Sequence, residues 1–187
     1  MVVLFALGCG ATNSQTAPQA PAASSAPAAA PVVPRDLGTL PEGECNVATF
    51  LATLGGRCTL VPTSRVSGTG DASQAAAATD HDACTVWSSG GMPPQTVNID
   101  LGAVRDVSGV LLVPDMTPPE GDVTHTLEAV DDLGAIKPVA IVKARMISAH
   151  GYAVAFPSPI KARFLRVTTT EATTWVAWRE IAPLSCQ

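Results

Sequence analysis

The chain has 187 residues, a formal net charge of −5 and only 4% aromatic residues, and its acidic and basic residues are scattered. Because no cluster of lysine or arginine occurs, the composition argues against binding to nucleic acid or to an anionic membrane surface. Without the charge-free N-terminal stretch, roughly 130–145 residues remain, which is the usual size of one domain.

Residues 1–9 resemble the export signal of a bacterial lipoprotein. A short apolar run ends in Ala6-Leu7-Gly8-Cys9, and Cys9 would become the lipidated first residue of the mature chain. The match departs from the usual pattern in the position of Leu7 and in the missing basic region before the apolar run. An ordinary cleaved signal peptide and an apolar start without a role stay open. The run is too short to span a membrane. We expect an exported protein of the outer membrane, cell surface or periplasm, held to the membrane only through this lipid.

Residues 10–43 have the composition of a linker. The first charged residue of the chain is Arg35, and Ala, Pro, Ser, Thr and Gln dominate the stretch before it. Repeated Ala-Pro steps disfavour helix, and few large apolar side chains are available to offset the entropy of ordering. The sequence therefore predicts a disordered tether that lifts a folded module from the membrane.

Residues 44–57 form the one candidate helix in the sequence. Asn46 can cap it, and the glycines at 55 and 56 can end it. Apolar residues follow at helical spacing, namely Val47, Phe50, Leu51 and Leu54.

From residue 58 to residue 187 the pattern changes to short strands separated by Gly, Pro, Asp and Asn. Residues 96–101 alternate between apolar and polar side chains, which is typical of a half-buried strand. Residues 107–113 are almost continuously apolar, which suits a strand covered on both faces. Further strands are predicted at 123–130, 136–144, 152–156, 162–169 and 174–181. Because no helices lie between them, the pattern indicates an all-β antiparallel sandwich or barrel.

Four sequence blocks occur in an order and at a spacing that suit one domain. They are DHDACTVW at 80–87, PQTVNIDLG at 94–102, ARFLRV at 162–167 and REI at 179–181. Together they resemble the discoidin family, which comprises the C-type domains of coagulation factors V and VIII and bacterial galactose-binding modules. The resemblance covers about 66–184 and implies a jelly-roll β-sandwich in which Trp87 packs in the core or in a semi-buried position. It also implies a binding module.

The same resemblance implies a structural Ca²⁺ site at the first block. Its ligands would be Asp80, Asp82, Thr85 and Glu180, with backbone carbonyls completing a shell of oxygen atoms. His81 stands where the family usually has glycine, and a positive φ there would be strained. The alternative is a turn without metal, in which Thr85 bonds the backbone and Glu180 pairs with an arginine.

The four cysteines of the folded part are Cys45, Cys58, Cys84 and Cys186, and none belongs to a C-x-x-C pair. In an exported protein they predict two disulfides, whereas in a cytosolic one they would be buried thiols. Four cysteines allow three pairings. Because the family often joins its two ends, the resemblance favours Cys186 with Cys45 or Cys58, and Cys84 with the other.

Enzyme activity is not expected. The sequence has no Gly-x-Ser-x-Gly motif, and its histidines, His81, His125 and His150, are far apart. His125 lies in a predicted strand, which favours a packed or rim position. The Asp131-Asp132 pair is explained by a turn.

Candidate ligand-binding residues lie near the loops at one end of the predicted sandwich. A sugar site needs an aromatic platform and hydrogen-bond donors, and residues of these types are Trp175, Tyr152, His150 and Arg145. The scarcity of aromatics counts against a strong sugar site. Alternatively, one of Trp175 and Trp178 packs inward and the other stacks on an arginine. Met116, in the loop 114–119, could also offer an apolar contact.

Two functions remain open. The first is a lipid-anchored surface protein whose discoidin-like module binds carbohydrate. The second is a protein-interaction or structural module of the cell envelope, with the same fold and no sugar site.

Overall fold

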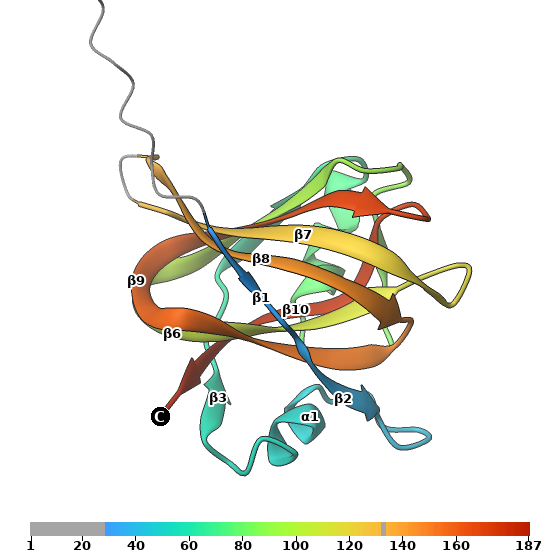
Figure 1. Ribbon diagram of the computed structural model, residues 1–187, viewed down its shortest axis with the longest axis horizontal. Helices are drawn as coiled ribbons and strands as arrows, with labels where there is room; N and C mark the ends of the chain where they lie inside the picture. The colour runs from blue at the N-terminus through green and yellow to red at the C-terminus, as the bar shows by residue number, and fades with distance from the viewer. Residues whose placement is uncertain (1–28, 132–133) are drawn as a thin grey trace, which may run out of the picture.

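Two long strands, β6 (Gln95–Asp115) and β9 (His150–Ala172), connect the two layers of a β-sandwich (Figure 1). The computed structural model describes residues 29–131 and 134–187. β6 and β9 pair antiparallel along their length, with register shifts between Asp100 and Arg105 and between Val107 and Gly109. At these irregularities both strands bend from one layer into the other. The segments 96–101 and 107–113 are therefore strands, as predicted, but they belong to one continuous element.

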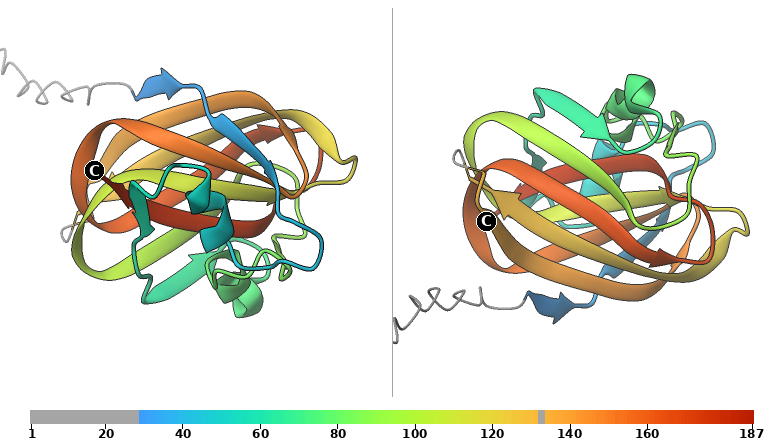
Figure 2. Two further views of the ribbon diagram at one scale, coloured as in Figure 1. Left: turned by 90° about the horizontal axis from the view of Figure 1, so that it is seen from below. Right: turned by 90° about the horizontal axis from the view of Figure 1, so that it is seen from above.

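The first layer contains the N-terminal part of β6 and the C-terminal part of β9. β4 (Arg65–Gly68) pairs with β6, and β7 (Glu120–Val130) pairs with β9. β8 (Ile136–Ile147) continues the layer beyond β7, and β1 (Ala30–Val32) adds a parallel edge strand. Seen from above in Figure 2, the strands lie in the order β4, β6, β9, β7, β8, and no helix of residues 29–131 and 134–187 covers their outer face.

The second layer contains the other halves of β6 and β9. β2 (Arg35–Thr39) pairs with β9, and β10 (Ala177–Cys186) pairs with β6. β3 (Cys58–Leu60) and the short β5 (Trp87–Ser88) pair with β10. The outer face of this layer is covered by the helix α1 (Ala48–Ala52), as the view from below in Figure 2 shows.

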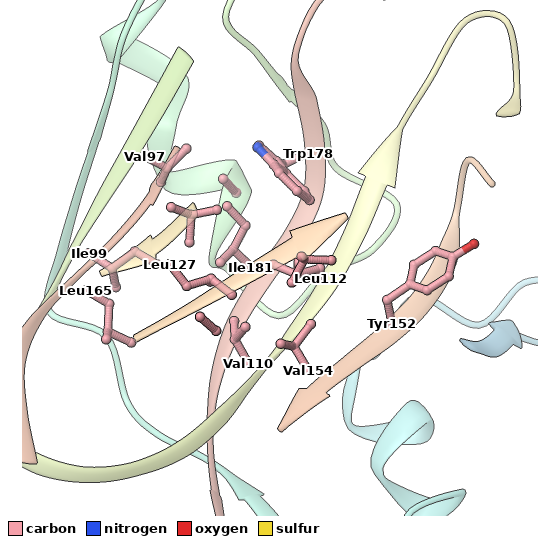
Figure 3. Close-up of a cluster of buried hydrophobic side chains, with 14 of the residues drawn as sticks. Val97, Ile99, Val110, Leu112, Leu127, Tyr152, Val154, Leu165, Trp178 and Ile181 are labelled. Carbon is pink, nitrogen blue, oxygen red and sulfur yellow. The ribbon is translucent and has the colours of Figure 1, made fainter. Parts of the chain in front are cut away.

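The main core lies between the layers. Alternate residues of the strands point into it, including Val97, Ile99, Leu127 and Leu165, and they meet Val110, Leu112, Trp178 and Ile181 (Figure 3). Trp87 is fully buried there, as the family resemblance implied. A second cluster packs Phe50 and Leu51 of α1 against Leu111 and Val113 of β6. The apolar run at 107–113 is thus covered on both faces, as predicted.

The helical prediction for 44–57 is too long, because only Ala48–Ala52 is α-helical. Asn46 does take part in its start, since its Oδ1 accepts the N–H of Ala48 at 2.9 Å. Gly55 and Gly56 both have positive φ, which ends the segment where the sequence predicted. α1 is also not the only helix, because η1 (Ala72–Ala78) is a 3₁₀-helix that the sequence analysis missed. Asp71 caps it by accepting the N–H of Ser73 at 3.0 Å.

The end of the predicted linker and the start of the last predicted strand also differ. Residues 30–39 lie within the expected tether, yet they form β1 and β2 because the edge of β8 and the N-terminal half of β9 offer backbone partners. The last strand begins at Ala177 rather than at residue 174, because Thr174 bonds the carbonyl of Thr117 and Val176 bonds Gly91. The predictions for Cys9 and for residues 10–28 lie outside the described residues.

Two disulfides hold the ends of the domain. Cys58 pairs with Cys186 and Cys45 with Cys84, which confirms the arrangement that the family resemblance favoured. The Cys58–Cys186 bond joins β3 to the end of β10, and the Cys45–Cys84 bond joins the segment before α1 to the loop at 80–85. In the part of the chain that the structure describes, no helix is long and apolar enough to cross a membrane.

Candidate functional site: an acidic loop and an exposed tryptophan

The acidic loop at 80–85 lies against the buried end of Glu180. A register shift between Trp178 and Glu180 in β10 marks a bulge, and Glu180 is fully buried. Its Oε2 accepts the backbone N–H of His81 at 2.8 Å. The pKa of Glu180 is raised to about 8, mainly because the carboxyl group is buried; the hydrogen bond from His81 lowers the pKa, and the negative charges of Asp80 and Asp82 raise it.

His81 has a φ of 66°, so this position does require the left-handed region. Glycine is usual at this position of the family motif, so histidine adopts this conformation with some strain. The ring of His81 turns back to Glu180, with Nδ1 3.6 Å from Oε1. Glu180 therefore pairs with a histidine of the loop, not with an arginine as the metal-free alternative supposed.

Turn hydrogen bonds close the rest of the loop. Thr85 Oγ1 donates to Asp80 Oδ2 at 2.9 Å and also lies 3.0 Å from the carbonyl oxygen of Asp82. Asp80 Oδ1 accepts the N–H of Asp82, and Asp82 Oδ1 accepts the N–H of Cys84. The four predicted ligand residues thus surround one loop, although among the described residues the carboxylate oxygens of Asp80, Asp82 and Glu180 do not all lie within 4.8 Å of one another. Asp82 also lies beside Cys45 and Cys84, but those sulfurs are joined in a disulfide and offer no thiolate to a metal.

The loops at the other candidate site place one tryptophan on the surface. Trp175, between β9 and β10, is 57% exposed, whereas Trp178 is buried and packs against His125 with ring centroids 4.9 Å apart. Of the two tryptophans, Trp178 is therefore the one that packs inward, and His125 has the packed position that its strand predicted. The Trp175 loop is fixed because Val176 donates its N–H to Gly91 and accepts one from Ser89.

The other three predicted ligand residues do not join Trp175 in one site. Tyr152 is buried, and its hydroxyl accepts the N–H of Ile147 at 2.8 Å, so its ring cannot serve as a platform. His150 bonds Asp36 of β2 at 3.0 Å. Arg145 pairs with Glu120 across the β7–β8 hairpin at 2.8 Å. Tyr152 was predicted from its residue type and its place near a loop, and the structure places it on the buried face of β9.

Met116 is also not an exposed loop tip. It is buried beside a cavity of about 20 Å³ whose lining includes His125, Trp175 and Trp178. A cavity of this size holds about one water molecule, so a larger ligand at this end must lie on the surface. Asp115 also lines this cavity and forms an ion pair with Arg179, with 2.7 Å between Oδ1 and Nη2, which no sequence motif indicated.

Comparison with known proteins places this geometry in a family. Residues 61–182 match the family model described as the F5/8 type C domain. None of the curated proteins matches the chain. Among solved structures, similarity is found to the family 32 carbohydrate-binding module of Clostridium perfringens NanJ in complex with galactose. That pair has a TM-score of 0.60 and 23% identity over 68% of this chain and 99% of the other.

Two further structures have the same fold, with similar TM-scores and sequence identities. One is a pectin-binding carbohydrate-binding module, with a TM-score of 0.55 and 22% identity over 67% of this chain and 91% of the other. The second is a chitosan-binding module from a Paenibacillus chitosanase/glucanase, with a TM-score of 0.55 and 18% identity over 69% and 99% of the two chains. At these identities the likeness shows the fold alone.

Proposed function

Because the chain belongs to the F5/8 type C domain family, we propose that its folded domain is a carbohydrate-binding module carried by an exported surface protein. The observation that supports this most directly is the position of Trp175. Trp87 and Trp178 are buried, but Trp175 presents an exposed indole on a loop that backbone hydrogen bonds hold in place. An aromatic face on a fixed loop suits the apolar face of a sugar ring.

Polar groups for sugar hydroxyls lie at the base of the same loop. Asp115 lines the cavity beside Trp175 and forms a half-buried ion pair with Arg179, whose Nη1 also donates to the carbonyl of Ala83 at 3.2 Å. Both side chains keep further donor or acceptor positions for a ligand. The structural neighbours named as binding galactose, pectin and chitosan support carbohydrate as the ligand class. Trp175 is thus the proposed platform, and Asp115 with Arg179 the proposed polar partners.

Calcium at the acidic loop forms a second part of the proposal. Oε1 of Glu180 is buried and has no hydrogen-bond partner among the described residues, since His81 Nδ1 lies 3.6 Å away, beyond hydrogen-bonding distance. Carboxylates, a hydroxyl and backbone carbonyls are the ligands that Ca²⁺ prefers. Asp80, Asp82, Thr85 and Glu180 would hold the ion, which would supply positive charge and fix the loop.

Export and lipidation at Cys9 complete the proposal. Both disulfides are consistent with an oxidising compartment, which supports export. Expression of the full chain with radiolabelled palmitate in a bacterial host tests the anchor. We expect label and membrane association for the unmodified chain and neither for C9A. Equal behaviour of the two proteins would contradict lipidation.

A glycan array tests carbohydrate binding directly. We expect the protein to bind a subset of galactose-, fucose- or glucosamine-type glycans, and W175A to lose at least about tenfold in affinity because the stacking platform is removed. V104A is the matched control, since Val104 has a similar exposed fraction in the bend of β6 at the opposite end. Its affinity should be unchanged.

The alternative function is a protein-interaction module of the cell envelope. The small cavity beside Trp175 favours it, because a surface without a deep pocket also suits a protein partner. An array without any bound glycan, together with a specific partner whose capture requires Trp175, would select this alternative.

A further inference from the structure

The outer face of the first layer is open and carries an aromatic side chain near the bend of β6 and β9. Side chains on the solvent face of an antiparallel sheet are usually polar. Phe164 of β9 departs from this rule: it lies on the outer face, between the inward-pointing Ala162 and Leu165, and is only partly buried. No helix covers this face in the described part of the chain (Figure 2).

Strand pairing fixes the neighbours of Phe164. Asp100 of β6 lies opposite Phe164, and Arg65 of β4 lies opposite Asp100. Two residues further along the strands, a second row crosses the same face. It consists of Ser67, Asn98, Arg166 and Glu128. The aromatic ring is therefore bordered by hydroxyl, amide, carboxylate and guanidinium groups.

Phe164 and Asn98 border two depressions in this face. One has a volume of about 260 Å³, and its lining is Arg65, Val66, Ser67, Asn98, Asp100 and Phe164. The other has about 280 Å³ and continues past Phe164 towards Val130 and Arg166. Sites for drug-sized ligands measure roughly 300–1,000 Å³, so each depression suits one smaller group, such as a sugar ring. Both are far larger than the cavity beside Trp175.

The polar side chains around Phe164 are already held in place. Arg166 Nε donates to Asn98 Oδ1 at 2.9 Å. Arg163 Nε lies 3.4 Å from Asp100 Oδ1, and its guanidinium lies 4.9 Å from the centre of the Phe164 ring. Side chains that are ordered before a ligand arrives lose less entropy when it binds.

Arg65 gives this face a charge preference. In the described part of the chain it forms no ion pair of its own, although Asp100 feels its charge. Asp100 is already engaged by Arg163 and by the N–H of Gly102 at 2.8 Å. The guanidinium of Arg65 can therefore bind a ligand carboxylate by donating two parallel hydrogen bonds to it.

We propose that the outer face of β4, β6 and β9 is a second carbohydrate site, which binds an acidic oligosaccharide with one sugar ring against Phe164 and a uronate carboxylate on Arg65. The proposal rests on carbohydrate as the ligand class of this domain but is independent of Trp175. Two sites on one module would let a long polysaccharide bind with greater avidity than a single sugar.

Affinity electrophoresis of the full chain tests this site, with polygalacturonate or neutral galactan in the gel. We expect R65A to weaken binding to polygalacturonate at least about fivefold, because a charge-assisted hydrogen bond is lost. R105A removes an equal charge from the exposed bend of β6 and should change the affinity less than twofold. F164A, checked for folding by circular dichroism, should also weaken binding, and W175A should leave this site intact.

The outcomes separate the two proposals. Equal affinities of R65A and R105A for polygalacturonate, or loss of its binding in W175A alone, overturn the second site. Galactan binding that depends on Trp175, without any binding of polygalacturonate, overturns the second site and leaves the proposed function standing. A protein that binds no carbohydrate contradicts both.

Discussion

Glu180 and His81 are 99 residues apart in the sequence, yet Oε2 of Glu180 accepts the backbone N–H of His81 at 2.8 Å. This contact joins the last strand to a loop residue in left-handed conformation. It satisfies one oxygen of a fully buried carboxyl group and leaves the other without a hydrogen bond in the described structure. The stability of the acidic loop therefore depends on how the charge of Glu180 is compensated.

The first prediction concerns pH in the presence of a chelator. The folded-state pKa of Glu180 is about 8, above its ordinary value of 4.5, so its contribution to stability is present below pH 4.5 and is lost as the pH rises through 8. At pH 7 the loss is about 3 kcal/mol in the free energy of unfolding. E180Q removes the titrating group and should lack this decline. Urea unfolding between pH 4.5 and 8 measures this decline. If the unfolding free energies of the unmodified protein and E180Q change in parallel with pH, the prediction is refuted.

The second prediction concerns calcium. A ligand that binds only the folded state at a hundred times its Kd stabilises that state by about 2.7 kcal/mol, so the melting temperature should rise with Ca²⁺ and fall with chelator. D80N should abolish the response, because Asp80 supplies a proposed ligand oxygen. D106N, which changes an exposed carboxylate in the bend of β6, is the control and should respond like the unmodified protein. An unchanged melting temperature would rule the site out.

The third prediction concerns His125. Its ring is buried, and burial lowers its pKa from 6.5 to about 3, so its contribution is present above pH 6.5 and is lost as the pH falls through 3. At pH 5 the loss is about 2 kcal/mol. H125Q can keep a hydrogen bond to Thr169, which lies 3.0 Å from the ring. The difference in unfolding free energy between the unmodified protein and H125Q should therefore become smaller from pH 7 to pH 5. A difference that stays constant would contradict this prediction.

The fourth prediction compares the disulfides. Loop-closure entropy predicts a cost of about 5 kcal/mol for losing Cys58–Cys186 and about 4 kcal/mol for losing Cys45–Cys84, since the paired residues are 128 and 39 positions apart. The double variant C58A/C186A should thus be less stable than C45A/C84A in denaturant unfolding. The reverse order would show that the Cys45–Cys84 bridge holds native contacts of the acidic loop beyond its effect on the unfolded chain.

The central strands could be predicted from the sequence because their apolar side chains either alternate with polar ones or form a continuous run. Val97 and Ile99 alternate with polar residues, and the run at 107–113 has two buried faces in the structure. Family motifs located the acidic loop, including the special backbone at His81. These features depend on local sequence, and therefore they can be inferred without knowing the tertiary contacts.

Other features depend on contacts that local sequence does not encode. The segment 30–39 forms strands only because β8 and β9 provide partners. Tyr152 was predicted to face a ligand, but it points into the core since the bend of β9 sets which face is inside. The open face around Phe164 results from strand order, which brings Arg65 and Asp100 beside it.

The most direct test of carbohydrate binding at the Trp175 loop is nuclear magnetic resonance of the three indole N–H groups during titration with galactose or with a glycan identified on the array. Trp87 donates its indole N–H to Asp71, Trp178 is buried, and only Trp175 is exposed. We predict a saturable shift of the Trp175 signal with little change in the other two. A bound glycan that leaves the Trp175 signal unmoved would contradict the account.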